Sequence, residues 1–131
     1  MTKKTHVAVG IAATLPIVMK CEPIAFIGLL GAVIPDWDII LGMKHRTTTH
    51  SLTALFISTI IITLLNHQVG LIWGLNYSIH LLLDSFTKMG VPLFYPFRKE
   101  YYGFKLIYTG KSEDLFICLL AIFFITCMYL Y

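Results

Sequence analysis

The chain has 131 residues, of which 57% are apolar and 13% are charged, and its mean hydropathy is +0.78. Soluble domains are about 45–50% apolar and about 25% charged, so this composition excludes a soluble globular domain of this length. The net charge of +3 is dispersed, which excludes a nucleic-acid-binding protein, and the three cysteines do not have the spacing of a disulfide framework. We therefore expect a single membrane-embedded domain over residues 1–131.

Five apolar segments predict helices, because lipid accepts only structures whose backbone polar groups are bonded within a helix or in a closed barrel. They cover residues 6–19, 23–34, 51–65, 69–84 and 115–131. The first lacks a cleavage site of small residues, so we interpret it as a retained helix and not as a signal peptide. Most are shorter than the roughly 20 residues of a full span, and the first two could form a tight or partly re-entrant hairpin.

Basic residues predict the orientation. If the five segments alternate in direction, the N-terminus and the connections 35–50 and 85–114 lie on one side of the membrane. That side then carries every lysine and arginine except Lys20. Because Lys and Arg accumulate on the cytoplasmic side, we expect a multi-pass inner-membrane protein with this side facing the cytoplasm.

The long connection 85–114 interleaves aromatic and basic residues, among them Tyr101, Tyr102 and Lys105. Aromatic rings beside cationic side chains suit the headgroup region of a bilayer, so one interpretation is an interfacial anchor. Long loops in compact domains are often functional, so the other is a wall or lid for a lipid-like substrate.

Two motifs place candidate metal ligands at the ends of segments on that same side. His80 and Asp84 are one helical turn apart, so their side chains share a face. Asp36 and Asp38 follow the second segment, where Pro35 is expected to end the helix. Each motif alone is weak, but ionisable residues inside apolar segments are costly and are therefore functional candidates.

A third motif lies before the third segment, where His45 and His50 share one short connection. Thr49 or Ser51 can cap that helix, which would leave His50 in its first turn. His6, at the start of the first segment, lies on the same predicted side.

Together these motifs supply seven candidate ligands: His6, Asp36, Asp38, His45, His50, His80 and Asp84. Imidazole and carboxylate ligands without thiolate suit Zn²⁺, with Mn²⁺ and Fe²⁺ as alternatives, better than magnesium or calcium. The set exceeds the four ligands of one structural zinc, so we predict two ions, or one ion with supporting partners. Paired ions clamp the attacking and leaving oxygens of a displacement at phosphorus, which predicts hydrolysis. Arg46 is a candidate for binding a phosphate oxygen, or simply follows the charge bias of this side.

Linked motifs occur in one order along nearly the whole chain: Thr5-His6, Pro35-Asp36-Trp37-Asp38, His45-Arg46-x-x-Thr49-His50-Ser51, His80-Leu81-Leu82-Leu83-Asp84-x-x-Thr87 and Gly90-Val91-Pro92-Leu93-x-x-Pro96-Phe97. Together they resemble the YdjM-like family of LexA-binding, inner-membrane-associated metal-dependent hydrolases. The chain departs from that family's pattern at Thr47, where a glycine is usual, and at Lys88-Met89, which leaves the local loop shapes open.

The resemblance implies a distant similarity to zinc-dependent phospholipase C and P1-type nucleases, which are all-helical and also use a His-x-x-x-Asp motif. It therefore implies hydrolysis of a phosphoester. It also adds Glu113, which occupies a position where the family carries an acidic residue, as a candidate base or supporting residue.

We predict an all-α fold: an integral membrane helical bundle of four to five helices with a metal site at the cytoplasmic boundary. The favoured function is metal-dependent hydrolysis of a phosphoester in a phospholipid or lipid-linked substrate, with catalytic roles for Asp38, Arg46 and Glu113.

Two other functions use the same ligands. A metal-binding regulatory or interaction protein of the membrane would lack an open coordination position. A metal-ion transporter would need ligands that continue across the bilayer, and the opposite side offers only Cys21, Glu22 and His67. That asymmetry makes transport the least favoured function.

Overall fold

The computed structural model describes residues 1–38, 42 and 46–130, and these residues form helices and connections without a strand. The α-helices are α1 (Lys3–Val18), α2 (Leu52–Leu65), α3 (His67–Ser85) and α4 (Ser112–Leu130). Three segments are 3₁₀ helices: η1 (Pro23–Ala32), η2 (Ile34–Asp38) and η3 (Thr48–His50). The all-α prediction is confirmed for the described part of the chain.

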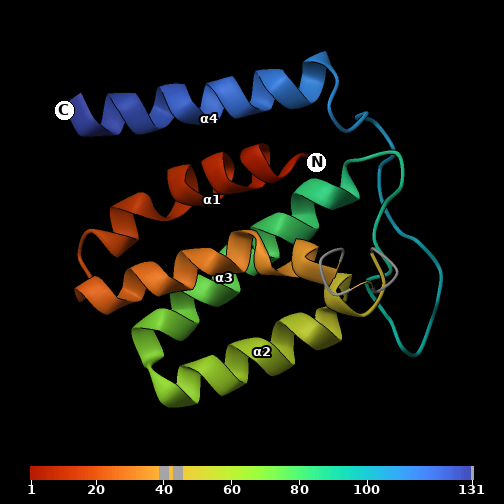
Figure 1. The fold of residues 1–131 in the computed structure, drawn as a ribbon, viewed down its shortest axis with the longest axis horizontal. Coiled ribbons are helices and arrows are strands. Elements are labelled where there is room, and N and C mark those ends of the chain that lie inside the picture. The colour runs from red at the N-terminus through yellow and green to blue at the C-terminus, as the bar shows by residue number, and fades with distance from the viewer. Residues whose placement is uncertain (39–41, 43–45, 131) are drawn as a thin grey trace.

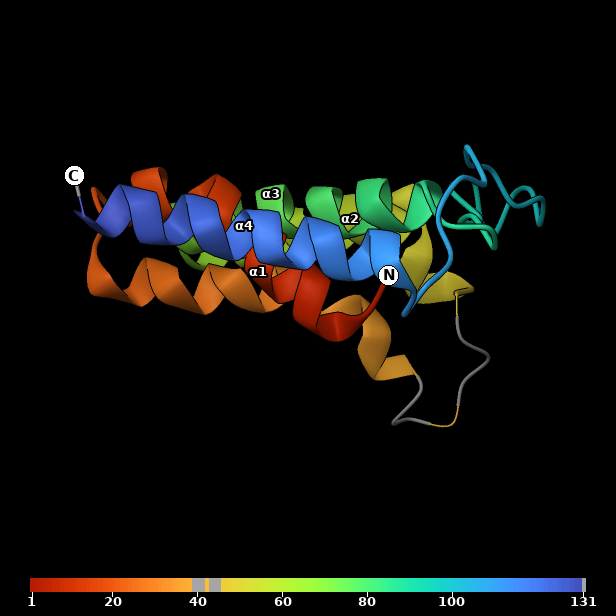
Figure 2. The same cartoon turned by 90° about the horizontal axis from the view of Figure 1, so that it is seen from above.

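The helices lie side by side in the order α4, α1, α3 and α2, and η1 packs against α3 and α1 (Figure 1). Seen from above, they form a flat slab with the long connection between α3 and α4 at one end (Figure 2). Successive segments run in opposite directions, so the N-terminus, η2, η3 and that connection meet at one end of the bundle (Figure 1). The condition on which the predicted orientation depends, that successive segments alternate in direction, therefore holds in this fold (Figure 1).

Polar caps set where three of the helices begin. The hydroxyl of Thr2 accepts a hydrogen bond from the Thr5 amide, so α1 begins earlier than its apolar run suggested. Ser51 caps α2 in the same way, as predicted, and Asn66 caps α3. His50 consequently precedes α2, in η3, and the expectation that it lies in the first turn of that helix is wrong.

The second segment is a 3₁₀ helix and not an α-helix, and its small residues recur with the period of that helix. A 3₁₀ helix has three residues per turn, so Ala25, Gly28 and Gly31 share one face, and all three are buried. A Cβ atom on Gly28 would lie 2.7 Å from the carbonyl oxygen of Val69 in α3. The backbones of η1 and α3 therefore lie closer together than a side chain at Gly28 would allow.

Pro35 does not end the helical structure as predicted. It lies near the start of η2, where its missing N–H is not needed, and the Asp36 amide donates to the Val33 carbonyl at 3.0 Å. Asp36 and Asp38 are therefore held in a tight, buried helical turn.

Among the described helices, α4 is the one that is long and apolar enough to cross a bilayer, with 19 residues. η1 and α2 are apolar but shorter. The outer face of α2 nevertheless exposes a continuous set of large apolar side chains: Phe56, Ile57, Ile60, Ile61, Leu64 and Leu65. Exposed apolar surface of this kind marks a membrane or a protein partner.

The contact between η1 and α3 generates a prediction about stability. We expect Gly28→Ala to lower the free energy of unfolding by about 1–3 kcal/mol, because the added methyl group must push two backbones apart. We expect Ile27→Val, on the exposed face of the same helix, to change it by less than about 0.5 kcal/mol. Thermal unfolding in detergent measures both, and equal melting temperatures would contradict the close packing.

Candidate metal centre

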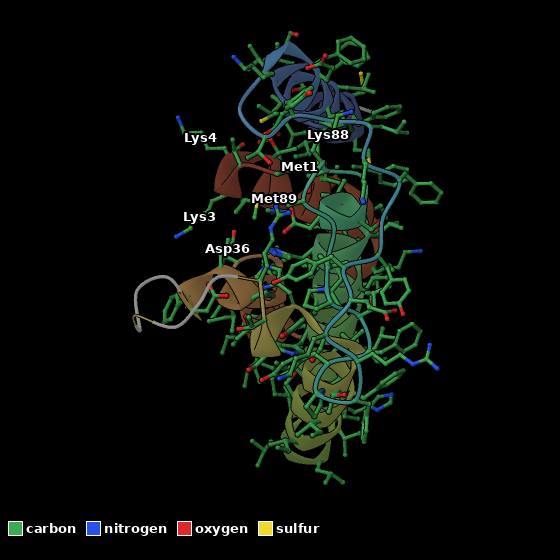
Figure 3. The ribbon with its side chains drawn as sticks, turned by 90° about the vertical axis from the view of Figure 1, so that its right-hand side faces the viewer. Met1, Lys3, Lys4, Asp36, Lys88 and Met89 are labelled. Atoms are coloured by element: carbon green, nitrogen blue, oxygen red, sulfur yellow. The ribbon has the colours of Figure 1, made fainter. Side chains whose placement is uncertain are left out.

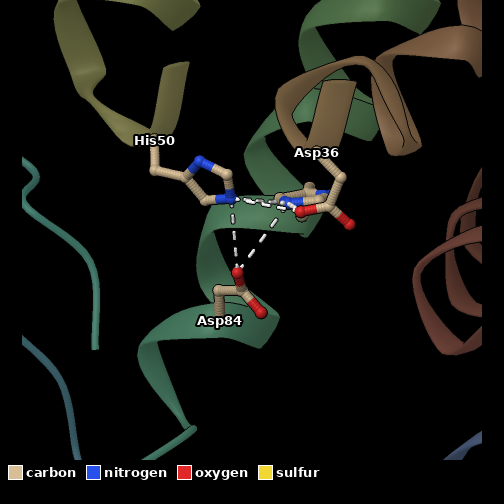
Figure 4. Close-up of side chains that lie close together, drawn as sticks. Asp36, His50 and Asp84 are labelled. Atoms are coloured by element: carbon tan, nitrogen blue, oxygen red, sulfur yellow. Dashed lines mark hydrogen bonds and ion pairs between the residues drawn. The ribbon is translucent and has the colours of Figure 1, made fainter. Parts of the chain in front are cut away.

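Four buried side chains from three elements converge at one end of the bundle. Asp36 comes from η2, His50 from η3, and His80 with Asp84 from the last turns of α3. Figure 4 shows the labelled Asp36, His50 and Asp84 pointing toward one another. The spacing of four residues on α3 brings His80 and Asp84 to the same face, as predicted.

The donor atoms of these four residues are spaced like the ligands of one ion. The two Nε2 atoms of His50 and His80 are 3.3 Å apart. Asp36 Oδ1 lies 3.4 Å and 3.6 Å from them, and Asp84 Oδ2 lies 3.5 Å and 3.8 Å from them. Ligands at about 2.0–2.2 Å from a tetrahedral ion are about 3.3–3.6 Å apart. This group could therefore hold a metal ion.

Hydrogen bonds at the far side of each ring orient the imidazoles. Nδ1 of His80 lies 2.8 Å from the Ala32 carbonyl, to which it can only donate, so the lone pair of a neutral ring is on Nε2. Nδ1 of His50 lies 3.0 Å from the Thr49 hydroxyl and 3.6 Å from Asp38. Both Nε2 atoms consequently face the cluster, as metal ligands require.

The electrostatics of the cluster also fit a cation. Burial alone would raise the pKa of Asp36, but the hydrogen bond from His50 and the neighbouring imidazole of His80 hold it below its ordinary value. Burial alone would lower the pKa of His50, but hydrogen bonding to Asp36 and Asp84 raises it above its ordinary value. Oδ2 of Asp84 is buried, and the groups near it are the Nε2 atoms of His50 and His80, at 3.5 Å and 3.8 Å. Two carboxylates thus create a site that favours positive charge.

His6 from α1 lies beside this group. Its ring stacks on that of His80, with centroids 3.8 Å apart. Its Nε2 is 3.2 Å from Oδ1 of Asp84, the carboxylate oxygen that does not face the other three residues. His6 is 1% exposed, and its other ring nitrogen, Nδ1, has no hydrogen-bond partner among the described residues. Asp84 therefore directs Oδ2 toward His50 and His80 and Oδ1 toward His6.

Arg46 and Asp38 surround the group without joining it. The Arg46 guanidinium donates to the Thr87 hydroxyl at 2.7 Å and to the Gly90 carbonyl at 3.2 Å, and it lies 3.0 Å from Oδ1 of Asp84. Asp38 accepts hydrogen bonds from the Arg46 amide and the Thr49 hydroxyl. Both side chains are buried, and both act on residues that carry the donor atoms.

The remaining predicted residues differ in where they lie. Glu113 is exposed on the first turn of α4, where its carboxylate accepts a hydrogen bond from the Ser112 hydroxyl. The neighbouring Asp114 is the buried carboxylate there, and it accepts from Thr5 and from the Thr2 and Gly110 amides. His45 lies outside the described residues.

Sequence reasoning missed the supporting partners. Thr49 and Thr87 stood within the quoted motifs, but nothing in their spacing showed that they would bond Asp38 and Arg46. The Ala32 carbonyl, which orients His80, carries no side-chain signal at all. Only the packing of η1 on α3 reveals it.

The model of the family described as YdjM inner membrane protein matches residues 1–131. The uncharacterized protein YvsG of Bacillus subtilis (strain 168) is 32% identical, and the match covers 73% of this chain and 74% of that protein. No solved structure matches the chain.

The geometry generates a prediction about metal content. We expect Asp84→Asn and His50→Ala each to weaken metal binding by at least about tenfold, because each removes a donor atom. His67→Ala, at the opposite end of the bundle, should bind as the unchanged protein does. Elemental analysis of the purified proteins after dialysis measures this. Equal metal content in all three variants would refute the site.

Proposed function

Because this chain belongs to the YdjM inner membrane protein family, we propose that it is a multi-pass inner-membrane protein that uses a bound transition metal to hydrolyse a phosphoester of a phospholipid or lipid-linked molecule. Zn²⁺ is the first choice of metal, since imidazole and carboxylate donors suit it, with Mn²⁺ and Fe²⁺ as alternatives.

One observation carries the hydrolytic part of the proposal: Asp84 offers Oδ2 to the four-residue group and Oδ1 to His6. Asp36, His50, His80 and Asp84 would hold a metal ion, and His6 lies beside them as a further donor, while Arg46 and the N-terminal amino group also contact Oδ1 of Asp84. Paired dications supply Lewis-acid stabilisation of both oxygens in a displacement at phosphorus, together with a water of lowered pKa. The phosphoester class itself follows the resemblance to zinc-dependent phospholipase C and P1-type nucleases on His80-x-x-x-Asp84. The LexA interaction that the resemblance also implies stays a prediction.

Two of the residues predicted to be catalytic are better assigned to positioning. Asp38 and Thr49 hold His50 so that its Nε2 faces the cluster. Arg46 holds Oδ1 of Asp84 and connects it to Thr87 in the long connection. A direct part in proton transfer for Glu113 would need a movement of α4, since Glu113 is exposed on that helix.

The apolar surface supports several membrane crossings and not only that of α4. Large apolar side chains are exposed along η1, α2 and α4, whereas the buried ionisable groups gather at one end. Among the described residues, every lysine and arginine except Lys20 lies at that same end (Figure 1), so the charge rule favours a cytoplasmic metal centre.

The second candidate function is metal binding without catalysis, as in a regulatory or interaction protein. The burial of the donors favours it, because Asp36 is 4% exposed and His50 and Asp84 are fully buried. Structural metal sites are closed in this way, whereas catalytic sites keep one open position. Metal transport is less well supported, since the described ligands gather at one end and His67 lies at the other.

The orientation can be tested with cysteines placed in a variant whose native Cys21, Cys118 and Cys127 are serines. We expect a cysteine at Lys99 to be protected from an impermeant thiol reagent in intact cells, because basic connections remain inside. A cysteine at His67 should react. Labelling in the reverse pattern would place the metal centre outside.

The reaction can be tested by chelation. We expect hydrolysis of phospholipid or lipid-phosphate substrates to stop when the metal is removed and to return when Zn²⁺ is restored. Asp38→Asn should lower the rate by about 10–100-fold while metal remains bound, because it loosens the support of His50.

His67→Ala serves as the matched control and should keep full activity. If the metal-loaded protein cleaves no phosphoester in a broad lipid panel, the hydrolase proposal fails. Retained stoichiometric metal in the same preparation would then favour the non-catalytic function.

A further inference from the structure

The seam between α1 and α4 contains two hollows that follow one another along the helices. The first, of about 450 Å³, lies where both helices begin and is lined by Lys3, Lys4 and Lys111, with Leu115 and Cys118 behind them. Figure 3 views this end of the molecule and shows Lys3 and Lys4 extending from the same side.

The second hollow, of about 340 Å³, continues between the same two helices. Its lining is entirely apolar: Val9, Ala12 and Ala13 from α1, and Ile117, Leu120, Ala121, Phe124 and Met128 from α4. Lys4 and Ala13 are nine positions apart, which is about 14 Å along the helix, or about half of the roughly 30 Å of a bilayer's hydrocarbon core. The seam is therefore about one leaflet deep.

One carboxylate, that of Asp114, also lines the first hollow, and its oxygens are already engaged. It accepts from the Thr2 amide at 2.9 Å and the Gly110 amide at 2.8 Å, and from the Thr5 hydroxyl. These bonds tie the start of α1 to the start of α4 and so keep the hollow open between them. Three lysines and one carboxylate that is already hydrogen-bonded line this hollow, so the charge of its lining favours an anion.

We propose that the seam between α1 and α4 binds one anionic phospholipid, with its phosphate among Lys3, Lys4 and Lys111 and an acyl chain along Ala13, Leu120 and Phe124. The occupant is anionic because the lysines complement a phosphate, and amphiphilic because an apolar hollow follows the lysine-lined one along the same two helices. This site shares no donor residue with the metal centre, so it does not depend on the proposed hydrolysis. It would anchor α4 to α1 from the lipid side.

Native mass spectrometry of the detergent-purified full chain tests the proposal, with dioleoylphosphatidylglycerol and dioleoylphosphatidylcholine added in turn. We expect one retained phosphatidylglycerol molecule per chain and no matching retention of phosphatidylcholine. The triple variant Lys3→Gln, Lys4→Gln, Lys111→Gln should weaken phosphatidylglycerol binding by at least about tenfold. The triple variant Arg98→Gln, Lys99→Gln, Lys105→Gln removes equal charge from the same end and should not.

The apolar part is tested separately, because lysine changes address only the headgroup. Ala13→Phe should fill the second hollow and release the lipid, whereas Val7→Phe, elsewhere on α1, should not. Circular dichroism verifies that each variant stays helical, and variants of Ala12 replace any that do not fold. Equal binding of both lipids, equal effects of the two triple variants, or binding of inorganic phosphate as tight as that of the lipid would overturn the proposal. The proposal would also be overturned if the protein were a dimer that Ala13→Phe dissociates, because a second copy of the chain would then occupy the seam.

Discussion

A single buried carboxylate, Asp84, connects most of the elements at the polar end of this protein. Its Oδ2 faces His50 and His80, and its Oδ1 contacts His6, Arg46 and the N-terminal amino group. A charged group that is buried away from water must be paired and hydrogen-bonded, because its burial otherwise costs several kcal/mol. The starts of α1 and η3 and the end of α3 are therefore held together by the requirement to compensate one charge.

The small-residue packing of η1 on α3 makes that arrangement possible. Gly28 and Gly31 bring the two backbones together, and the Ala32 carbonyl then reaches Nδ1 of His80. The same close approach carries η2 to the end of the bundle, so that Asp36 meets the histidines. An apolar contact in the middle of the molecule thus decides the tautomer of a polar group at its end.

The rest of the surface divides the molecule by polarity along its length. Large apolar side chains cover the outside of α2 and α4, and ionisable groups gather where the chain enters and leaves the helices. In a bilayer this division places polar chemistry beside the headgroups, where phosphate esters are. The seam between α1 and α4 has the same polarity, with lysines at one end and apolar side chains beyond them.

The sequence alone predicted the helical class and all four residues of the group that could hold a metal ion, because these depend on local spacing. His80 and Asp84 converge through the period of one helix, and Pro35-Asp36 and His50 stand at segment ends wherever the segments pack. Other features were decided only by tertiary structure. The close approach of η1 to α3 depends on what Gly28 and Gly31 pack against. The role of Arg46 depends on Thr87, which is 41 residues away in the sequence, and that of Asp38 depends on Thr49, which is 11 residues away. Glu113 and Asp114 are adjacent in sequence, yet only the packing of α1 on α4 buries the second and leaves the first exposed, because burial is a property of the neighbouring helix and not of the residue.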